Sequence, residues 1–510
     1  MLKVLNKVNL NLEILLLIVL VGASLRIYNL GKQSIWLDEA RSFFRAQKNI
    51  QELWTDQIKE SNPPLYDIIF HYYLRLFDKK NEFQIRLFSA MLGILIIPLA
   101  FIVGSNMFNQ KVGLLFSSLI AISPYHIYYS QDAKMYSLLS LLSLGSFFLY
   151  YLSLKTGKRV YWVFYTFITI LLIYCHNYGF LLFLAQIFIF IFFYLKYRKY
   201  LINFLLSLSV IFICFIPRIN CIFRQISMDY NPWIRFSESK GIILTFKYFS
   251  LLCWHMKENL SIKLSLLIGL PTYAFIFAVP IFIRNKDKEE DVKRINYSEK
   301  LIFILLYLIM PLFIASLISL KKPIYISGRY DMSVFPAFYL MASLGLYRIK
   351  KPYWRNFLIG AILLTTSISL YNYYYIYEKS NDRKIAGYIE SRMDKDDLWI
   401  FTDLTLASFR YYSQNYFYPN LFSFPVTDLG WLPRKALEGE ELYVNNEINK
   451  LIDKIQPFIK KDSVIRVIYS DSKINRSLIE ELKKSHKLLD IINFVPGRND
   501  NQCNAIYIFR

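Results

Sequence analysis

Long apolar runs separated by short polar segments dominate the chain up to about residue 375. A helix needs about 20 mostly apolar residues to cross a bilayer. The pattern therefore predicts eleven transmembrane helices, near residues 11–30, 87–108, 111–129, 135–154, 160–176, 178–195, 200–217, 261–283, 300–320, 332–349 and 355–374. The many later runs favour an uncleaved first helix over a cleaved signal peptide. The chain is thus expected to be a polytopic α-helical membrane protein.

Basic residues mark one side of this predicted bundle. Short cytoplasmic loops carry an excess of Lys and Arg. Threading the spans from a cytoplasmic N-terminus places six basic segments on one face: residues 3–7, 111, 155–159, 196–199, 284–294 and 348–355. The extracytoplasmic face then receives residues 31–86, 130–134, 176–177, 218–260 and 321–330, and everything after about 375.

Beyond residue 375 the pattern changes to short apolar bursts in a charged background. The bursts DLWIFTD, SVIRVIYSD and AIYIFR predict strands, and SLIEELKKSHKLLD predicts a helix. Strands alternating with helices indicate a small α/β domain. We therefore expect a transmembrane domain over residues 1–374, with an outer loop over 31–86, and a soluble extracytoplasmic α/β domain over 375–510. Residues 240–257 predict an interfacial helix, with a further crossing as the alternative.

Composition excludes several classes of function. The formal charge of +22 lies in short runs between apolar segments, as topology signals do, so no nucleic-acid partner is expected. The five cysteines show no CxxC spacing, which argues against a zinc site and a disulfide framework. The chain has no Walker loop and no GxGxxG motif, so nucleotide hydrolysis is not supported.

An adjacent carboxylate pair, Asp38 and Glu39, follows the first predicted helix. Like charges repel, so one member of such a pair becomes a better proton acceptor, which suits a general base or a metal ligand. The alternative is structural, with Asp38 capping a helix or lying in a solvated loop.

Three further outer segments carry polar residues. Pro63 and Pro64 open an apolar helix, and Tyr66 at that depth suits either a binding role or an interfacial anchor. Asp132 and Lys134 follow the third span, where they contact substrate or pair with each other. Arg329 and Tyr330 precede the tenth span against the positive-inside bias, so Arg329 binds phosphate or extends to lipid headgroups.

These segments resemble membrane glycosyltransferases of the GT-C fold, especially the protein O-mannosyltransferases and lipid A aminoarabinose transferases. The resemblance runs from the first helix to about residue 350, through SIWLDEA, NPPLYDIIFHYYLRLF, RLFSAMLG, SPYHIYYSQDAKMYSLL, HNYGFLLFLAQ and GRYDMSVFPAFYLMASLGL, in that order.

This resemblance implies an inverting hexosyl or pentosyl transferase of the cell membrane, with its active site outside the cytoplasm. Its donor would be a polyprenyl-phosphate sugar, and its acceptor a hydroxyl or phosphate of a lipid, glycan or protein. By resemblance, Asp38 matches the catalytic acidic residue of the first loop, Glu39 its neighbour and Asp132 a second acidic site. The substrate-binding candidates are Asn62, Tyr66, Arg86, Lys134, His176, Arg329 and Tyr330.

Two departures from the family pattern concern the first loop. Asn62 stands where the family often has Lys or His, so a phosphate-binding cation is missing at that position. In the family an acidic residue often directly precedes that position, whereas Glu60 lies one residue earlier in this chain. The cofactor is left open: a divalent metal ion is compatible, with Glu39, Glu60 and Asp132 as candidate ligands.

The rival class is a lipid or polysaccharide transporter or flippase, which would carry its charges near the bilayer midplane in broken helices.

Overall fold

The computed structural model describes residues 2–56, 62–78, 80–227, 241–251, 259–282, 296–392, 397–402, 405–413, 420–424, 441–459, 463–469, 473–493 and 505–510. The chain forms two compact units. The helical unit comprises residues 1–30, 49–223 and 234–377, and the sheet unit comprises residues 31–48, 224–233 and 378–510. The division into a transmembrane domain over 1–374 and a soluble domain over 375–510 stays a prediction.

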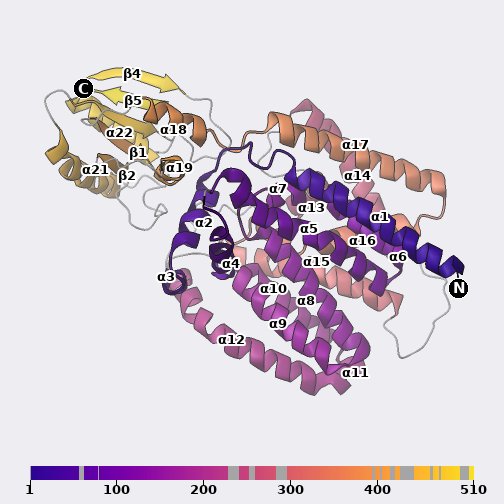
Figure 1. Cartoon of the computed structure of the whole chain (residues 1–510). Coiled ribbons are helices and arrows are strands. Elements are labelled where there is room, and N and C mark those ends of the chain that lie inside the picture. The colour runs from indigo at the N-terminus through magenta and orange to yellow at the C-terminus, as the bar shows by residue number, and fades with distance from the viewer. Residues whose placement is uncertain are drawn as a thin grey trace. The chain divides into compact units, whose positions relative to one another are not determined.

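A helix lies over each of the eleven predicted spans (Figure 1). These helices are α1 (Leu2–Ile27), α5 (Glu82–Met107), the pair α6 (Gln110–Ile122) and α7 (Pro124–Ser130), α8 (Tyr136–Thr156), α9 (Arg159–Cys175), α10 (Asn177–Phe192), α12 (Leu201–Ser227), α14 (Leu260–Phe282), α15 (Tyr297–Ser319), α16 (Phe335–Arg348) and α17 (Pro352–Tyr371). Among the described residues, seven helices are long and apolar enough to cross a membrane, or eight if α6 and α7 are one bent span. Because α9, α10 and α16 have only 17, 16 and 14 residues, the count of eleven crossings stays a prediction.

Shorter elements connect these helices. They are α3 (Ile50–Asp56), α4 (Leu65–Leu74), α11 (Tyr194–Tyr197), α13 (Gly241–Leu251), the 3-10 turns η1 (Arg198–Tyr200) and η2 (Tyr330–Ser333), and the π-helical turn η3 (Asn372–Ile376). The predicted interfacial helix over 240–257 corresponds to α13, and residues 252–258 lie outside the described part of the chain.

A bend between α6 and α7 shapes the centre of the helical unit. The two helices meet at 60°, and Pro124 opens α7 at a position where a proline is tolerated. The last carbonyls of a helix lack intrahelical donors. The buried guanidinium of Arg26 on α1 supplies them, donating to the carbonyl oxygens of Ile120 and Ala121 at 2.9 Å each. The bend is thereby stabilised, and the chain leaves α7 into the polar segment 131–135.

Helix α8 is the most deeply buried of the long helices and contacts α5, α9, α10 and α16. Its serines hydrogen-bond to adjacent helices: Ser143 lies 2.9 Å from the Tyr307 hydroxyl on α15, and Ser146 lies 2.8 Å from the Thr169 hydroxyl on α9. Small residues and interhelical hydrogen bonds are the main means of holding helices together in lipid. These hydrogen bonds hold the middle of α8 against its neighbours.

The sheet unit contains a five-stranded mixed sheet in the order β2-β1-β3-β5-β4. The strands are β1 (Leu398–Thr402), β2 (Leu421–Phe424), β3 (Ile465–Tyr469), β4 (Leu488–Asn493) and β5 (Ala505–Phe509). Strand β1 runs parallel to β2 and β3, whereas β5 runs antiparallel to β3 and β4. Three strands lie at the predicted bursts. The predicted helix over 477–490 was too long, because α22 (Lys473–Ser485) ends before Lys487, whose backbone pairs with Arg510 and starts β4.

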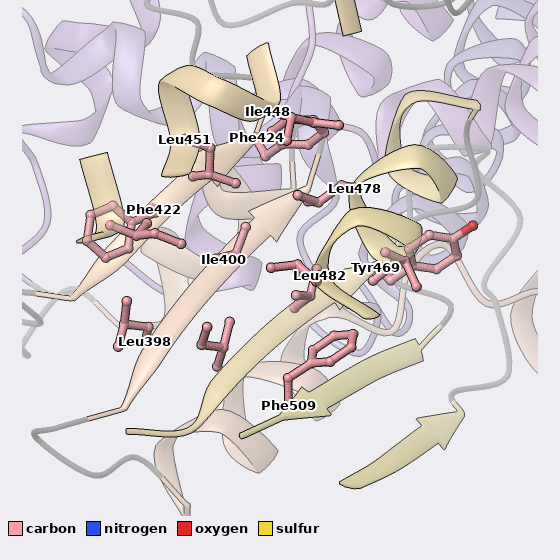
Figure 2. Packing of buried hydrophobic residues seen from close by; sticks show 14 of the residues in the cluster. Leu398, Ile400, Phe422, Phe424, Ile448, Leu451, Tyr469, Leu478, Leu482 and Phe509 are labelled. Atoms are coloured by element: carbon pink, nitrogen blue, oxygen red, sulfur yellow. The ribbon is translucent and has the colours of Figure 1, made fainter. Parts of the chain in front are cut away.

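Successive side chains of β1 point to opposite faces of the sheet, and both faces are covered by helices. Leu398 and Ile400 point into one apolar cluster with α21 (Glu441–Ile455) and α22, which Figure 2 shows. Trp399 and Phe401 point to the other face, into a cluster with α18 (Asp382–Glu390) and α19 (Thr405–Tyr412). A strand buried on both faces reads as a continuous apolar run, which is how LWIF appears in the sequence.

Candidate functional site

The carboxylate pair of the first outer loop lies on α2 (Leu37–Gln47), in the sheet unit. Both residues fall in the first turn, where carboxylates favour the positive end of the helix dipole. Glu39 is fully buried and forms an ion pair with Lys379 at 3.2 Å, and Lys379 is itself only 2% exposed. Asp38 is half-buried on the same turn. The two neighbours therefore have different environments: Glu39 holds a structural pair, and Asp38 is partly open to solvent.

The stretch before α2 is held by residues far along the chain. Arg383 donates to the carbonyl oxygens of Gly31 and Lys32, at 3.1 and 3.3 Å. Further on, the Tyr412 hydroxyl accepts from the backbone N–H of Ile35 at 2.7 Å. Helix α2 also packs on α19, where the rings of Phe43 and Tyr411 meet edge to face, 5.2 Å apart. The C-terminal residues thus fix the backbone that leads into the carboxylate pair.

The buried Glu39–Lys379 pair gives a first prediction. Removing one partner of a buried pair leaves an uncompensated charge, which typically costs about 3–5 kcal/mol, whereas removing both costs much less. We expect Lys379→Met to lower the thermal unfolding midpoint strongly, and Glu39→Gln/Lys379→Met to recover most of the loss. Thermal unfolding of the purified chain measures both. A single variant as stable as the wild type would show that this pair contributes nothing to α2.

In the helical unit, a chain of hydrogen bonds joins the first and second outer segments. The Tyr66 hydroxyl on α4 lies 2.9 Å from the Ser89 hydroxyl on α5, and Ser89 donates to the Lys134 carbonyl at 3.2 Å. Arg86 lies one turn before Ser89, is buried, and donates to the Leu30 carbonyl at 3.1 Å. Three predicted substrate-binding residues, Tyr66, Arg86 and Lys134, therefore come from one connected region.

Asp132 is fully buried in the segment that follows α7. The side chain of its neighbour Gln131 anchors this segment, donating to the carbonyls of Arg26 and Tyr28 at 2.9 and 2.8 Å and accepting from the Tyr373 hydroxyl at 2.7 Å. The Lys134 side chain is half-buried. The segment is thus tied to the end of α1 and to η3, which gives Asp132 and Lys134 a fixed backbone.

Arg329 lies beside this segment. Its Nε donates to the Tyr136 hydroxyl at 2.6 Å, and its guanidinium carbon lies 5.8 Å and 5.9 Å from the ring centroids of Tyr136 and Tyr330. A guanidinium close to two aromatic rings is held by cation–π attraction as well as by the hydrogen bond. The predicted Arg329–Tyr330 pair therefore presents a positioned, half-buried cation.

A buried carboxylate that the sequence reasoning missed holds the turn on which Arg329 lies. Asp331 accepts from the backbone N–H of Gly328 at 2.7 Å, the Tyr125 hydroxyl at 2.8 Å and the Thr245 hydroxyl. Gly328 has a φ of 77°, which favours glycine. Burial raises the pKa of Asp331 to about 6, although the three donors oppose that rise. The available signal was the run GRYD, in which a glycine and an acid flank the Arg–Tyr pair.

His176 completes this group of residues. It is 2% exposed and lies between α9 and α10, where its Nδ1 accepts from the Tyr178 backbone N–H at 3.1 Å and so caps α10. Its ring meets that of Tyr330 at a centroid distance of 4.9 Å. Burial, with Arg329 as a second cause, lowers the pKa of His176 to about 3. The imidazole is therefore neutral at physiological pH.

All seven predicted substrate-binding residues thus lie in the helical unit. Asp38 and Glu39 belong to the sheet unit. Asn62 is half-buried immediately before Pro63, and Glu60 lies outside the described residues. Within the described part of the chain, no three His, Cys, Asp or Glu side chains are grouped as a metal site would need. Glu39 is a poor metal ligand here, because binding a cation would compete with its Lys379 pair.

Comparison with solved structures identifies the fold. ArnT from Cupriavidus metallidurans in the apo state superposes with a TM-score of 0.62 at 10% identity, covering 97% of both chains. The same protein bound to undecaprenyl phosphate gives 0.61 at 11% identity, also over 97% of both chains. The Archaeoglobus fulgidus oligosaccharyltransferase in complex with Zn and sulfate gives 0.53 at 12% identity, covering 89% of this chain and 67% of that one.

The chain is therefore an integral membrane protein of the GT-C fold, which confirms the predicted resemblance. The family model for dolichyl-phosphate-mannose-protein mannosyltransferase matches residues 61–220, which include Tyr66, Arg86, Asp132, Lys134 and His176. A search of the curated proteins by sequence finds no match.

Proposed function

We propose that this protein is an inverting glycosyltransferase that moves a sugar from a polyprenyl-phosphate donor to an acceptor hydroxyl or phosphate on the extracytoplasmic side. The observation that carries the proposal is the positioned guanidinium of Arg329, held by Tyr136 and beside the buried imidazole of His176. The mannosyltransferase family match over residues 61–220 and the likeness to an ArnT structure bound to undecaprenyl phosphate support it.

In the proposed reaction, the acceptor oxygen attacks the anomeric carbon while the bond from that carbon to the phosphate oxygen breaks. Asp38 takes the acceptor proton, and the electron pair of the broken bond stays on the lipid phosphate. One displacement from the face opposite the leaving group inverts the anomeric centre, as in other single-displacement sugar transfers. No covalent enzyme intermediate is needed, which suits a site with a single base.

Cations at the phosphate would stabilise the charge that develops as the bond breaks. A phosphate is already a weak base, so positive charge matters more than a general acid at its oxygens. Arg329 is the first candidate because both its hydrogen bond and its aromatic neighbours fix it before substrate arrives. Lys134 and Arg86 are further candidates. Preorganised groups of this kind cost no reorganisation at the moment of reaction.

A direct assay tests the proposed function. The purified chain is incubated with a panel of polyprenyl-phosphate sugars and with lipid, glycan and peptide acceptors, and mass spectrometry measures consumption of each donor. We expect one donor to be converted into free polyprenyl phosphate plus a glycosylated acceptor. A flippase would move the lipid between leaflets of a vesicle and leave the whole panel intact, which would overturn the proposal.

The proposed location gives a second prediction. Threading from a cytoplasmic N-terminus through eleven spans places residues after about 375 outside the cytoplasm. We expect a reporter enzyme that works only in the extracytoplasmic compartment to be active when fused after residue 375 or after Arg510. A reporter fused within residues 284–294 should behave oppositely and serves as the control. Activity of a cytoplasmic reporter at both C-terminal positions would reverse the assignment.

A further inference from the structure

His176 has one ring nitrogen whose role in the fold is clear and one whose role is not. Nδ1 caps α10 by accepting from the Tyr178 backbone N–H. Nε2 is buried and makes no hydrogen bond within the part of the chain that the structure describes. A buried polar group without a partner is costly, so native structures usually give such an atom a purpose.

The capping bond determines which nitrogen carries the proton. An Nδ1 that accepts a hydrogen bond has no hydrogen of its own, so the neutral imidazole carries its single proton on Nε2. Because α10 begins at Asn177, the backbone of that helix maintains this tautomer. His176 is therefore a fixed donor at Nε2. Its other nitrogen is occupied, so His176 is unsuited to take a proton as a general base.

The groups around Nε2 indicate which kind of ligand this nitrogen binds. The ring lies against Tyr330 and 6.4 Å from the ring of Tyr136, the two tyrosines that flank the Arg329 guanidinium. An N–H donor beside a guanidinium, in a site walled by aromatic rings, favours an oxygen that carries negative charge.

We propose that His176 Nε2 donates a hydrogen bond to a phosphate oxygen of the polyprenyl-phosphate carrier, next to Arg329. This inference rests on the proposed function and deepens it. The neutral His176 would donate a directional hydrogen bond, and Arg329 would contribute the positive charge. The sugar would then extend away from this pair, and the bridging oxygen, which leaves with the lipid phosphate, would lie closest to the guanidinium.

Two substitutions separate the capping role from the binding role. The side-chain amide of Asn reaches about as far as Nδ1 and is a strong helix N-cap. That of Gln reaches about as far as Nε2 and keeps a donor there. We expect His176→Asn to fold as stably as the wild type and to bind undecaprenyl phosphate about 10- to 100-fold more weakly. His176→Gln should be less stable and should retain most of the affinity. A purely structural role predicts the same order of stability but the opposite order of affinity, with the less stable His176→Gln binding undecaprenyl phosphate more weakly than His176→Asn.

The ligands in this test distinguish the source of the phosphate. The purified full chain is titrated with undecaprenyl phosphate, with undecaprenol, with phosphatidic acid and with inorganic phosphate. Only undecaprenyl phosphate should show the loss in His176→Asn. An equal loss for phosphatidic acid or inorganic phosphate would mean a general anion site and would overturn the assignment to the carrier. Equal affinity of the wild type and His176→Asn for undecaprenyl phosphate would also overturn it.

Nitrogen NMR provides a readout that does not depend on turnover. The chain has five histidines, so histidine labelled with ¹⁵N gives few signals, and the His176→Gln spectrum identifies the one of interest. We expect the neutral Nε2–H tautomer at pH 7, with the Nε2 signal moving on addition of undecaprenyl phosphate. A signal that does not move, in a protein that still consumes a donor, would disprove this inference alone. A wild-type protein that neither binds the carrier nor consumes any donor would disprove the proposed function itself.

Discussion

Replacing Asp38 with Asn is expected to abolish sugar transfer while the protein still folds and binds its donor. The amide is nearly the same size as the carboxylate but does not take the acceptor proton, and loss of a general base typically costs about 10²–10⁴-fold in rate. Asp38 is half-buried in the first turn of α2, so the substitution removes a charge without opening a cavity. Turnover and donor affinity of the purified variant are the measurements.

Two further substitutions serve as controls for Asp38→Asn. Glu52→Gln removes an exposed carboxylate on α3 and should leave turnover unchanged. Glu39→Gln should reduce transfer less than Asp38→Asn, and its main effect should be a loss of stability, because it leaves Lys379 without its charged partner. Near-normal turnover of Asp38→Asn would remove Asp38 from the role of base, whatever the other two variants do.

Replacing Arg329 with Ala is expected to slow transfer about 10²-fold or more, with a smaller effect on donor binding. The reason is that the phosphate charge facing the guanidinium grows as the glycosidic bond breaks. Arg329→Lys should recover only part of the rate, because an ammonium lacks the planar fork that hydrogen-bonds Tyr136 and lies over two aromatic rings. Donor consumption per folded molecule measures both variants.

Arg348 offers a matched control for this experiment. It lies at the other end of α16, and its guanidinium carbon is 3.9 Å from the ring centroid of Tyr297. Arg348→Ala therefore removes a cation–π contact of the same kind without touching the proposed phosphate site. Its specific activity should match that of the wild type. If Arg329→Ala and Arg329→Lys also match it, then Arg329 only anchors the protein to headgroups.

Hydropathy located the helices well because a helix in a bilayer needs a long run of mostly apolar residues. The sequence therefore located a helix at all eleven places, including the bent pair α6 and α7. It singled out the substrate-binding candidates, which stay predictions, because polar residues next to apolar spans are few. Short elements were harder. The run KLLD continues an apolar helical pattern, and only the backbone pairing of Lys487 with Arg510 ends α22 and starts β4.

Roles that depend on distant partners could not be assigned from the local sequence. Lys379 looks like any charged residue after the last span, yet it is buried against Glu39, 340 positions earlier. Asp331 looks like a loop acid, and its function depends on Tyr125 and Thr245 from two other helices. The tautomer of His176 likewise depends on the cap of α10. Such contacts arise from tertiary packing, which one sequence without its structure does not reveal.

The C-terminal residues that hold the first outer loop are synthesised long after it. Residues 31–48 leave the ribosome early, whereas Lys379, Arg383 and Tyr412, which hold this segment, lie 340 to 377 positions later. Ribosomes add about 5–20 residues per second, so the loop waits roughly 20–70 s for its partners. During that interval the rest of the helical unit, residues 49–223 and 234–377, is synthesised. The carboxylate pair therefore reaches its final setting only late in synthesis, and under the proposed function a chain that ends before Lys379 would be inactive.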